Sequence, residues 1–328
     1  MAKDIGFGVV GLGMGANRCR VIHETEGARL VAVADIRADR AQQIGERYGV
    51  DWYEDYKQLL DKDDIDVIYV MTFSGLHGEH AILAARAGKH VITTKPMEVS
   101  LQKADEMIRE CENAGVKLAV DFDMRYDQIQ RTIKKAVQEG LLGKLILGEA
   151  RLKWFRSQAY YDANGGWRGT WKLDGGGSLS NQTVHFIDQL LWMMGPVESV
   201  YAEAGVYAHN IEGEDLGAVF LTFKSGARGV IVGTTTFPRN CYAGIEIHGD
   251  KGAVLTTRGS AEWIGAEGVD LVPPIPDPCP KNATEDMISA LTNGTQVQVD
   301  GYEGRKSVEV LQAIRRSIET SQRVNLPL

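Results

Sequence analysis

The sequence has no long apolar run. No stretch approaches the ~18 consecutive apolar residues that a transmembrane helix requires, so we expect no membrane partner. The first residues pass directly into an apolar strand, without the apolar segment and cleavage site of a secretion signal. The sequence therefore predicts a cytoplasmic protein.

Cysteines are few, and basic residues are fewer than acidic ones. Cys19, Cys111, Cys241 and Cys279 are widely separated, and their spacing fits neither a metal site nor a disulfide scaffold. We therefore expect reduced thiols and no bound metal. The formal net charge of −8 argues against the basic surface that neutralises nucleic-acid phosphates. We expect small-molecule ligands and no nucleic-acid partner.

Length and periodicity predict two domains. A chain of 328 residues exceeds the usual size of one domain, and 44% hydrophobic with 24% charged residues is typical of a globular protein. Strands alternate with helices up to about residue 124, and strands without regular intervening helices follow. We predict an α/β NAD-binding Rossmann domain with a parallel sheet at residues 1–124. An α+β substrate-binding and oligomerisation domain with a large, mostly antiparallel open sheet follows at residues 125–328.

Apolar runs and helical periodicity place the elements of both halves. In the first half we predict strands at 5–10, 30–34, 67–71, 90–93 and 117–120, and helices near 15–25, 38–47, 78–87 and 100–113. In the second half a helix at 129–140 precedes strands at 145–155, 197–208, 216–224, 227–236 and 243–248. The remaining elements are a helix with an apolar stripe at 181–194, an extended proline-rich segment at 271–280 and a last helix at 307–322.

A glycine turn follows the first strand. Gly11 lets the backbone turn tightly, Gly13 lets a pyrophosphate approach without meeting a Cβ atom, and Ala16 lets helix and strand pack closely. The phosphates of a dinucleotide then lie at a helix N-terminus, where unpaired N–H groups and the helix dipole stabilise negative charge. We therefore expect this turn, with Met14 and Gly15, to bind the cofactor.

The acid at the end of the next strand predicts which dinucleotide binds. Asp35 follows the turn by about 20 residues, the spacing of a carboxylate that accepts the adenosine ribose hydroxyls. A carboxylate at this position repels a 2′-phosphate, so NAD is favoured over NADP. Arg37 argues in the opposite direction, because an arginine just beyond the strand can bind a 2′-phosphate.

Lys95 is the first candidate for chemistry. It follows the strand at 90–93 and precedes Pro96, and in an open α/β sheet ligands bind beyond the carboxyl ends of the strands. A cation there can hold a substrate hydroxyl and stabilise the alkoxide that develops as hydride leaves carbon. The alternative is a solvated surface lysine. Pro96 is a candidate for a cis peptide bond.

The second candidate, His185, follows a glycine cluster. Glycines at 175–177 allow the backbone to approach a ligand closely, and Asn181 and His185 are spaced i, i+4 on one predicted helix face. Histidine suits proton abstraction from an alcohol because an unperturbed imidazole titrates near neutral pH. The alternative is a buried structural imidazole. Lys95, an independent candidate in the other domain, favours catalysis.

These motifs together resemble the glucose-fructose oxidoreductase, inositol dehydrogenase and MocA-type oxidoreductases. The matching segments span both halves of the chain: 11–16, 72–77, 94–96, 167–171 and 175–185, followed by Asp188. The resemblance implies a Rossmann domain that binds a nicotinamide dinucleotide, a second domain with a large open sheet, and oxidation or reduction of a sugar or polyol. It also implies a homodimer or homotetramer.

The resemblance also assigns roles to residues. It implies that Lys95 and His185 contact the reacting hydroxyl and that His185 acts as acid or base. Lys95 is expected to contact the cofactor as well. Thr72 and His77 match the segment near the nicotinamide and are expected in the cofactor site.

Three positions depart from the pattern of this family. Thr94 replaces a frequent glutamate, Asn181 replaces a frequent aspartate, and residues 72–74 replace the usual Thr-Pro-Asn. A neutral amide can orient an imidazole without stabilising imidazolium as a carboxylate does. The sequence therefore leaves open whether Asn181 or Asp188 orients His185.

Aromatic and arginine residues near the glycine cluster are candidates for substrate binding. Ring faces pack against sugar C–H groups, and guanidinium groups donate to hydroxyls or to a carboxylate. Trp167 and Arg168 are the main candidates, with Trp154, Arg156, Tyr160, Tyr161 and Trp171 nearby. The alternative is ordinary packing of strand aromatics.

The leading hypothesis is an NAD-dependent dehydrogenase for a sugar or cyclic polyol. His185 takes the hydroxyl proton and Lys95 polarises the same oxygen, with Trp167, Arg168 and Asn181 in the substrate site. One alternative is a glycoside hydrolase that uses tightly held NAD to oxidise a sugar hydroxyl transiently. The other is a non-catalytic dinucleotide-binding regulator, against which Lys95 and His185 argue.

Overall fold

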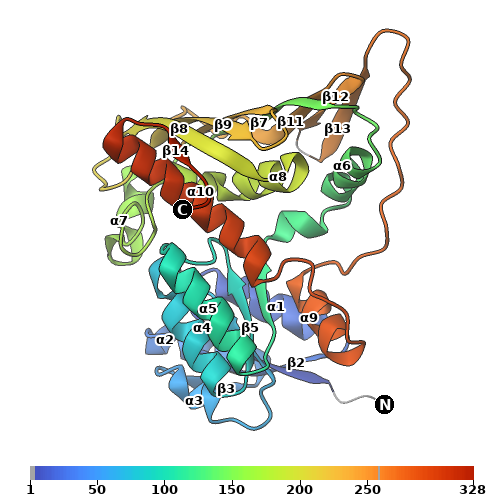
Figure 1. The fold of residues 1–328 in the computed structure, drawn as a ribbon. Coiled ribbons are helices and arrows are strands. Elements are labelled where there is room, and N and C mark those ends of the chain that lie inside the picture. The colour runs from blue at the N-terminus through green and yellow to red at the C-terminus, as the bar shows by residue number, and fades with distance from the viewer. Residues whose placement is uncertain (1–3, 258) are drawn as a thin grey trace. The chain divides into compact units, whose positions relative to one another are not determined.

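The computed structural model describes residues 4–257 and 259–328, and this part of the chain forms two compact units (Figure 1). The first unit runs to Asp123 and also contains Cys279–Arg305, and the second contains Met124–Pro278 and Lys306–Leu328. The return of the chain to the first unit has no counterpart in the predicted division at 124/125. The assignment of 1–124 to NAD binding and of 125–328 to substrate binding and oligomerisation stays a prediction.

The first unit is built on a parallel sheet with the strand order β3-β2-β1-β4-β5-β6. This order confirms the predicted Rossmann sheet, and the reversal of order beside β1 is where such sheets bind ligands. The short β3 was not predicted, since three largely exposed residues carry no periodic signal. The strands are β1 (Ile5–Val10), β2 (Ala28–Ala34), β3 (Asp51–Tyr53), β4 (Val67–Val70), β5 (His90–Thr94) and β6 (Leu118–Asp121).

Helices connect these strands, and a late segment of the chain joins them. The helices are α1 (Gly15–Glu24), α2 (Ala38–Tyr48), α3 (Lys57–Leu60), α4 (His77–Arg86), α5 (Leu101–Asn113) and α9 (Ala283–Thr292), with 3₁₀ turns η1 (Ser74–Leu76) and η2 (Asp123–Tyr126). The amide of Val120 in β6 donates to the carbonyl of Val299 at 2.9 Å, and α9 packs against β6. Residues 279–305 therefore complete the outer edge of the sheet.

The second unit is built on a mostly antiparallel open sheet with the order β13-β12-β11-β7-β10-β9-β8-β14, in which only the pair β7 and β10 is parallel among the described strands. The predicted open sheet is confirmed, and β12 to β14 extend it beyond the prediction. The strands are β7 (Leu145–Lys153), β8 (Val197–Gly205), β9 (Leu216–Phe223), β10 (Arg228–Thr234), β11 (Ala243–Gly249), β12 (Gly252–Thr257), β13 (Ser260–Gly265) and β14 (Val324–Asn325).

One face of this sheet is covered by α8, which packs against β7 and β11 (Figure 1). The predicted apolar stripe of this helix is confirmed, because Val184, Ile187, Leu191 and Met194 are all buried. The helices of this unit are α6 (Gln128–Gln138), α7 (Gln158–Gly166), α8 (Val184–Met194) and α10 (Gly301–Thr320), which begins in the first unit, and a π-helix, η3 (Ser178–Thr183), leads into α8. The proline-rich segment 271–280 is extended, as predicted.

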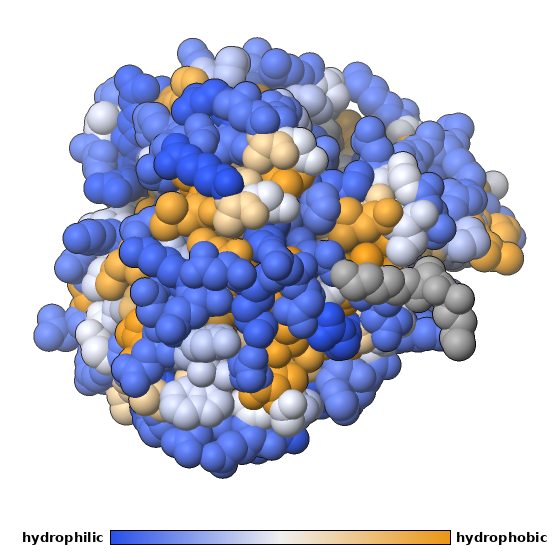
Figure 2. Space-filling view, turned by 90° about the horizontal axis from the view of Figure 1, so that it is seen from below, coloured by the Kyte–Doolittle hydropathy of each residue, from blue (hydrophilic) through white to orange (hydrophobic). Residues whose placement is uncertain are grey.

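The surface is that of a polar protein. On the face drawn in Figure 2, hydrophilic residues predominate and hydrophobic residues form separate patches. Among residues 4–257 and 259–328, no helix combines the length and the apolar character that crossing a bilayer requires. The same residues contain no group of three or more side chains arranged to hold a metal ion.

Candidate active site

The glycine turn lies between β1 and α1. Gly11 has a φ of +87°, and a Cβ atom there would approach the carbonyl oxygen of Met71 to 2.7 Å, so the fold itself requires glycine. Gly13 has no such internal requirement, since the nearest heavy atom to a Cβ would be Arg40 Nη1 at 3.7 Å. A glycine that leaves open space at the N-terminus of α1 fits the close approach of a pyrophosphate.

The other turn residues complete this N-terminus. Gly15 begins α1 and lies close to Met71, where a Cβ atom would approach the Met71 Cβ to 3.1 Å. Met14 precedes the helix and is 75% exposed. The turn is therefore accessible from solvent on the side away from β4.

The carboxylate of Asp35 is fixed beside the turn. Its Oδ2 accepts a hydrogen bond from the Leu12 amide at 2.7 Å, and its Oδ1 accepts one from the Arg37 amide at 2.9 Å. Asp35 directly follows β2, and only 7% of its surface is exposed. The group expected to bind ribose is thus bonded directly to the backbone of the turn expected to bind phosphate.

Two arginines flank this carboxylate, and they have different partners. Arg40, in the first turn of α2, forms an ion pair with Asp35 Oδ2 at 3.3 Å. Arg37 is exposed and pairs with Asp39 at 2.7 Å. The sequence prediction named Arg37 and missed Arg40, whose only signal was its place one helical turn beyond the acid.

The loops after β4 and β5 are joined by a buried histidine. His77 Nδ1 lies 2.9 Å from the carbonyl oxygen of Pro96, and Nε2 lies 3.2 Å from that of Thr72. Burial lowers the pKa of His77 to about 4, so the imidazole is neutral at pH 7 and donates its single N–H to one of these two carbonyl oxygens. His77 has no exposed surface, and its expected place in the cofactor site stays a prediction.

Lys95 lies at the carboxyl edge of the same sheet. It is half-buried, directly follows β5 and forms a cis peptide bond with Pro96. Glu98, which the sequence prediction did not single out, secures this loop by accepting hydrogen bonds from the amides of Gly78 and Val99, both at 2.7 Å. Burial raises the pKa of Glu98. The loop that carries Lys95 is therefore anchored to the first turn of α4.

In the second unit, His185 lies in the first turn of α8 and is half-buried. The residues before it form the π-helix η3, so the helix predicted to start at Asn181 changes type at Val184. The face expected to be shared by Asn181 and His185 therefore spans the junction of a π-helix and an α-helix, and it stays a prediction.

The side chain of Asn181 has a carboxylate partner from outside the helix. Asn181 Nδ2 donates to Asp174 Oδ1, and Asp174 Oδ2 accepts a hydrogen bond from the Gly169 amide at 2.8 Å. Asn181 Oδ1 accepts from Gln182 Nε2 at 2.6 Å. Buried Asp174 therefore holds the side chain of Asn181, a contact that sequence spacing alone did not indicate.

The glycines at 175–177 have a packing role. Gly176 has a φ of +134°, and a Cβ atom on Gly177 would clash with the carbonyl oxygen of Glu214. The Glu214 carboxylate accepts hydrogen bonds from the amides of Gly177 at 3.2 Å and Leu179 at 2.8 Å. The expectation that these glycines leave room for a ligand is therefore replaced, for Gly177, by close packing on the Glu214 backbone.

Asp188 lies one turn beyond His185 and has a buried cationic partner. Arg125 donates two hydrogen bonds to it, from Nε at 2.6 Å and from Nη2 at 2.8 Å. Both side chains are nearly fully buried, so the ion pair compensates two charges in the interior of the unit. The orientation of His185 by Asn181 or by Asp188 stays a prediction.

Trp167 and Arg168 lie in a set of stacked rings and guanidinium groups that we call the arginine–aromatic cluster. Arg168 Cζ lies 4.5 Å from the ring centroid of Tyr160 and 4.9 Å from that of Trp167. Arg156 Cζ lies 5.2 Å from the Tyr160 centroid and 4.9 Å from that of Trp154. The cluster consists of Trp154, Arg156, Tyr160, Trp167 and Arg168.

The cluster is connected to the segment before His185. Gln182 Nε2 donates to the Tyr160 hydroxyl at 2.9 Å, and Arg156 Nη2 donates to Gln182 Oε1 at 2.7 Å. Trp171 is not part of it and stacks instead on Arg315 of α10, at 4.6 Å. Polar groups suited to a sugar therefore gather beside η3.

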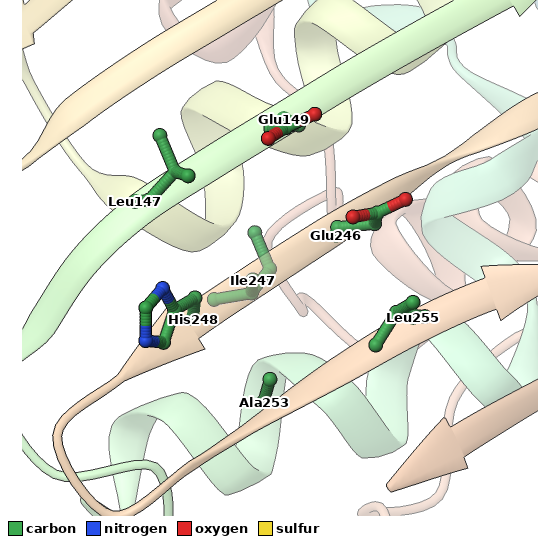
Figure 3. Close-up of a pocket in the computed structure, with 7 residues that line it drawn as sticks. All are labelled: Leu147, Glu149, Glu246, Ile247, His248, Ala253 and Leu255. Carbon is green, nitrogen blue, oxygen red and sulfur yellow. The ribbon is translucent and has the colours of Figure 1, made fainter. Parts of the chain in front are cut away.

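A further pocket lies on the open sheet itself, away from α8 (Figure 3). It has a volume of about 280 Å³ and is lined by Leu147, Glu149, Glu246, Ile247, His248, Ala253 and Leu255, from β7, β11 and β12. Arg151 pairs with both Glu149 and Glu246 on this face. None of the predicted site residues lines this pocket.

A parallel dinucleotide-type sheet followed by a large open sheet defines a class of two-unit oxidoreductases. The chain belongs to the GFO/IDH/MocA oxidoreductase family. Residues 5–122 match the oxidoreductase family with an NAD-binding Rossmann fold, and residues 130–255 match the GFO/IDH/MocA C-terminal domain. The predicted membership is therefore confirmed.

Individual relatives agree with this membership. Myo-inositol 2-dehydrogenase of Thermotoga maritima is 31% identical over 258 residues, which cover 76% of this chain and 74% of the relative. 1,5-anhydro-D-fructose reductase of Ensifer adhaerens is 28% identical and covers 90% of both chains. The crystal structure of the WlbA dehydrogenase from Bordetella pertussis, in complex with NADH and UDP-GlcNAcA, is 32% identical with a TM-score of 0.92, covering 100% of this chain and 99% of that one.

Proposed function

We propose that the protein is an NAD-dependent dehydrogenase that transfers hydride between a hydroxyl group of a sugar or cyclic polyol and the nicotinamide. The observation that carries this proposal is Asp35, whose buried carboxylate is bonded to the Leu12 amide of the glycine turn. This arrangement favours a dinucleotide with free ribose hydroxyls. The named substrates and ligands of the relatives support a carbohydrate or polyol.

The cofactor would be held at the carboxyl edge of the first sheet. Gly11, Gly13, Met14 and Gly15 would bind the pyrophosphate at the N-terminus of α1, and Asp35 would accept the ribose hydroxyls. The NADH bound in the solved relative supports NAD as the cofactor, and the negative charge of Asp35 disfavours NADP. When bound, the nicotinamide supplies the acceptor for the hydride.

Lys95 and His185 would carry the proton and charge transfers. His185 accepts the proton of the substrate hydroxyl, and Lys95 donates a hydrogen bond to the same oxygen and stabilises its negative charge. The hydride leaves with the electron pair of the C–H bond, and the carbon and oxygen form a carbonyl group. Asn181, Trp167 and Arg168 would position the substrate.

A panel of sugars and polyols, assayed for NADH formation at saturating NAD, tests this function. Lys95→Ala and His185→Ala are each expected to lower kcat by about 10²-fold or more, as removal of a general acid–base group does. Full turnover by both variants would rule the mechanism out. Release of an aglycone without net NADH would instead identify a glycoside hydrolase, and cofactor binding without any turnover would identify a regulator.

We also propose a cytoplasmic homodimer or homotetramer that assembles through the open sheet. The face opposite α8 exposes apolar side chains, including Phe220 on β9, which is 59% exposed. The same face carries the charged side chains Glu149, Arg151 and Glu246, and apolar side chains exposed among such charges favour association with a second copy. Light scattering at micromolar concentration tests the proposal, and a monomer would refute it.

A further inference from the structure

We infer that the substrate carries an oxyanion, a carboxylate or a phosphate, which Arg156 and Arg168 bind through their guanidinium groups. The inference rests on the proposed function and names the substrate class of that site. It concerns the arginine–aromatic cluster, whose two cations lie over the same ring, that of Tyr160.

Neither guanidinium is balanced by a carboxylate in the part of the chain that the structure describes. Among residues 4–257 and 259–328, Arg168 donates to a single acceptor, the carbonyl oxygen of Tyr160, at 3.3 Å. Arg156 donates to the carbonyl oxygen of Phe155 and to the side-chain oxygens of Gln182 and Asn240. All these acceptors are neutral. Since a guanidinium has five N–H donors, most donors of Arg168 have no protein acceptor among these residues.

The acidic side chains nearby in the sequence and the network are already engaged. Asp174 accepts hydrogen bonds from the Gly169 amide and from Asn181. Asp215 is fully buried and accepts three backbone amides and His209 Nδ1. Glu212 accepts the Trp171 amide at 3.0 Å. Asp162, between the two arginines in sequence, accepts from Gln158 Nε2 at 2.8 Å. These carboxylates keep their negative charge, but among the described residues none of them pairs with Arg156 or Arg168, so both guanidinium groups can still form an ion pair with a ligand.

The cluster is bonded to the helix segment that bears His185. Arg156 donates to Gln182, Gln182 donates to Asn181, and both belong to the π-helix that runs directly into the turn of His185. An anionic group on Arg156 and Arg168 would therefore place the rest of a substrate beside this segment. Binding of the anionic group by the two arginines would therefore also determine where the reacting hydroxyl of the substrate lies relative to this segment.

The chemistry of the cluster distinguishes an oxyanion from a neutral hydroxyl. Guanidinium forks bind carboxylate and phosphate with two parallel hydrogen bonds, and stacking on aromatic rings holds them in place. Both arginines are half-buried, so water screens their mutual repulsion less than at the surface. An oxyanion relieves this repulsion, whereas a neutral sugar does not.

Calorimetric titration of the NADH-saturated full-length protein tests the inference. The probes are D-glucose, D-galactose and D-mannose, each compared with its uronic acid and its 1-phosphate, so that the two sources of negative charge are separated. In at least one configuration, a charged member is expected to bind about tenfold or more tightly than its neutral parent. Arg168→Gln and Arg156→Gln are each expected to lower that preference by about tenfold, and the control Arg228→Gln, an exposed arginine that donates only to backbone carbonyls, is expected to leave it unchanged.

Charged members that bind no tighter than their parents, or a preference that survives both arginine substitutions, would overturn the inference. The absence of binding by every probe would overturn it as well. Turnover of the same probes separates it from the proposed function. A neutral sugar that is oxidised in preference to its charged derivatives would support the dehydrogenase and overturn the inference. Tight binding of a charged probe that depends on the two arginines, without turnover, would support the inference and argue against the dehydrogenase.

Discussion

Replacing Asp35 by serine is expected to shift the cofactor preference from NADH towards NADPH. The carboxylate accepts the Leu12 amide at 2.7 Å and pairs with Arg40 at 3.3 Å, and it would also accept two ribose hydroxyls. A hydrogen bond to a charged group contributes about 1.5–3 kcal/mol. Leu12 and Arg40 already use part of the hydrogen-bonding capacity of the Asp35 carboxylate. We therefore expect the Kd of NADH to rise by about 10-fold to 100-fold.

The same substitution is expected to strengthen NADPH binding by about tenfold. It removes a negative charge that would repel the 2′-phosphate, and it breaks the ion pair that holds the Arg40 guanidinium on Asp35. Arg40→Gln in the Asp35→Ser background is expected to cancel this gain. Asp35→Asn is the matched control, because its amide oxygen can still accept from Leu12 while the charge is lost.

Fluorescence titration with NADH and NADPH measures all four proteins without a known substrate. Each variant is first checked for a cooperative unfolding transition, so that a weakened cofactor affinity is not confused with loss of the fold. Equal affinity of the unaltered protein for NADH and NADPH would refute the reasoning. An unchanged ratio of the two affinities in Asp35→Ser would refute it as well.

Two further predictions concern the second unit. Asp174→Asn leaves one side-chain oxygen for the two donors that the carboxylate accepts, the Gly169 amide and Asn181 Nδ2, so the free energy of unfolding in urea is expected to fall by about 1–3 kcal/mol. Adding Asn181→Asp supplies an acceptor for the new NH₂ group and is expected to restore part of this loss. A double variant no more stable than the single one would contradict this pairing. Burial raises the pKa of Glu214 from 4.5 to about 7, so between these values the folded state keeps a proton that the unfolded state has released, and stability falls as pH rises. Glu214→Gln is therefore expected to gain stability relative to the unaltered protein from about pH 5 to about pH 8, by up to about 3 kcal/mol, and a pH-independent difference would argue against it.

Local patterns in the sequence were sufficient for much of the fold. The strand at residues 5–10, the parallel character of the first sheet and the apolar stripe of α8 follow from short-range periodicity and were predicted correctly. Gly11 was predicted because a tight turn needs a positive φ, and the backbone has one. Weakly periodic elements such as β3 were missed.

Contacts between distant segments could not be predicted in the same way. Asp174 supports Asn181 only because the backbone turns at Gly175 to Gly177 bring the two side chains together. The close packing of Gly177 on Glu214 depends on a segment 37 residues away in the chain. A single sequence gives no signal that two segments so far apart pack together, so the predicted role of these glycines was incomplete.

The return of residues 279–305 to the first unit affects how this protein can be divided. Val299 and Asp300 pair with β6, the last strand of the parallel sheet, and α9 packs beside it. A fragment that ends near residue 124 would leave the amides and carbonyls of this strand without their natural partner, and bare strand edges recruit other chains. The coenzyme-binding half should therefore be produced together with the 279–305 peptide, by fusion or by co-expression, if it is to remain monodisperse.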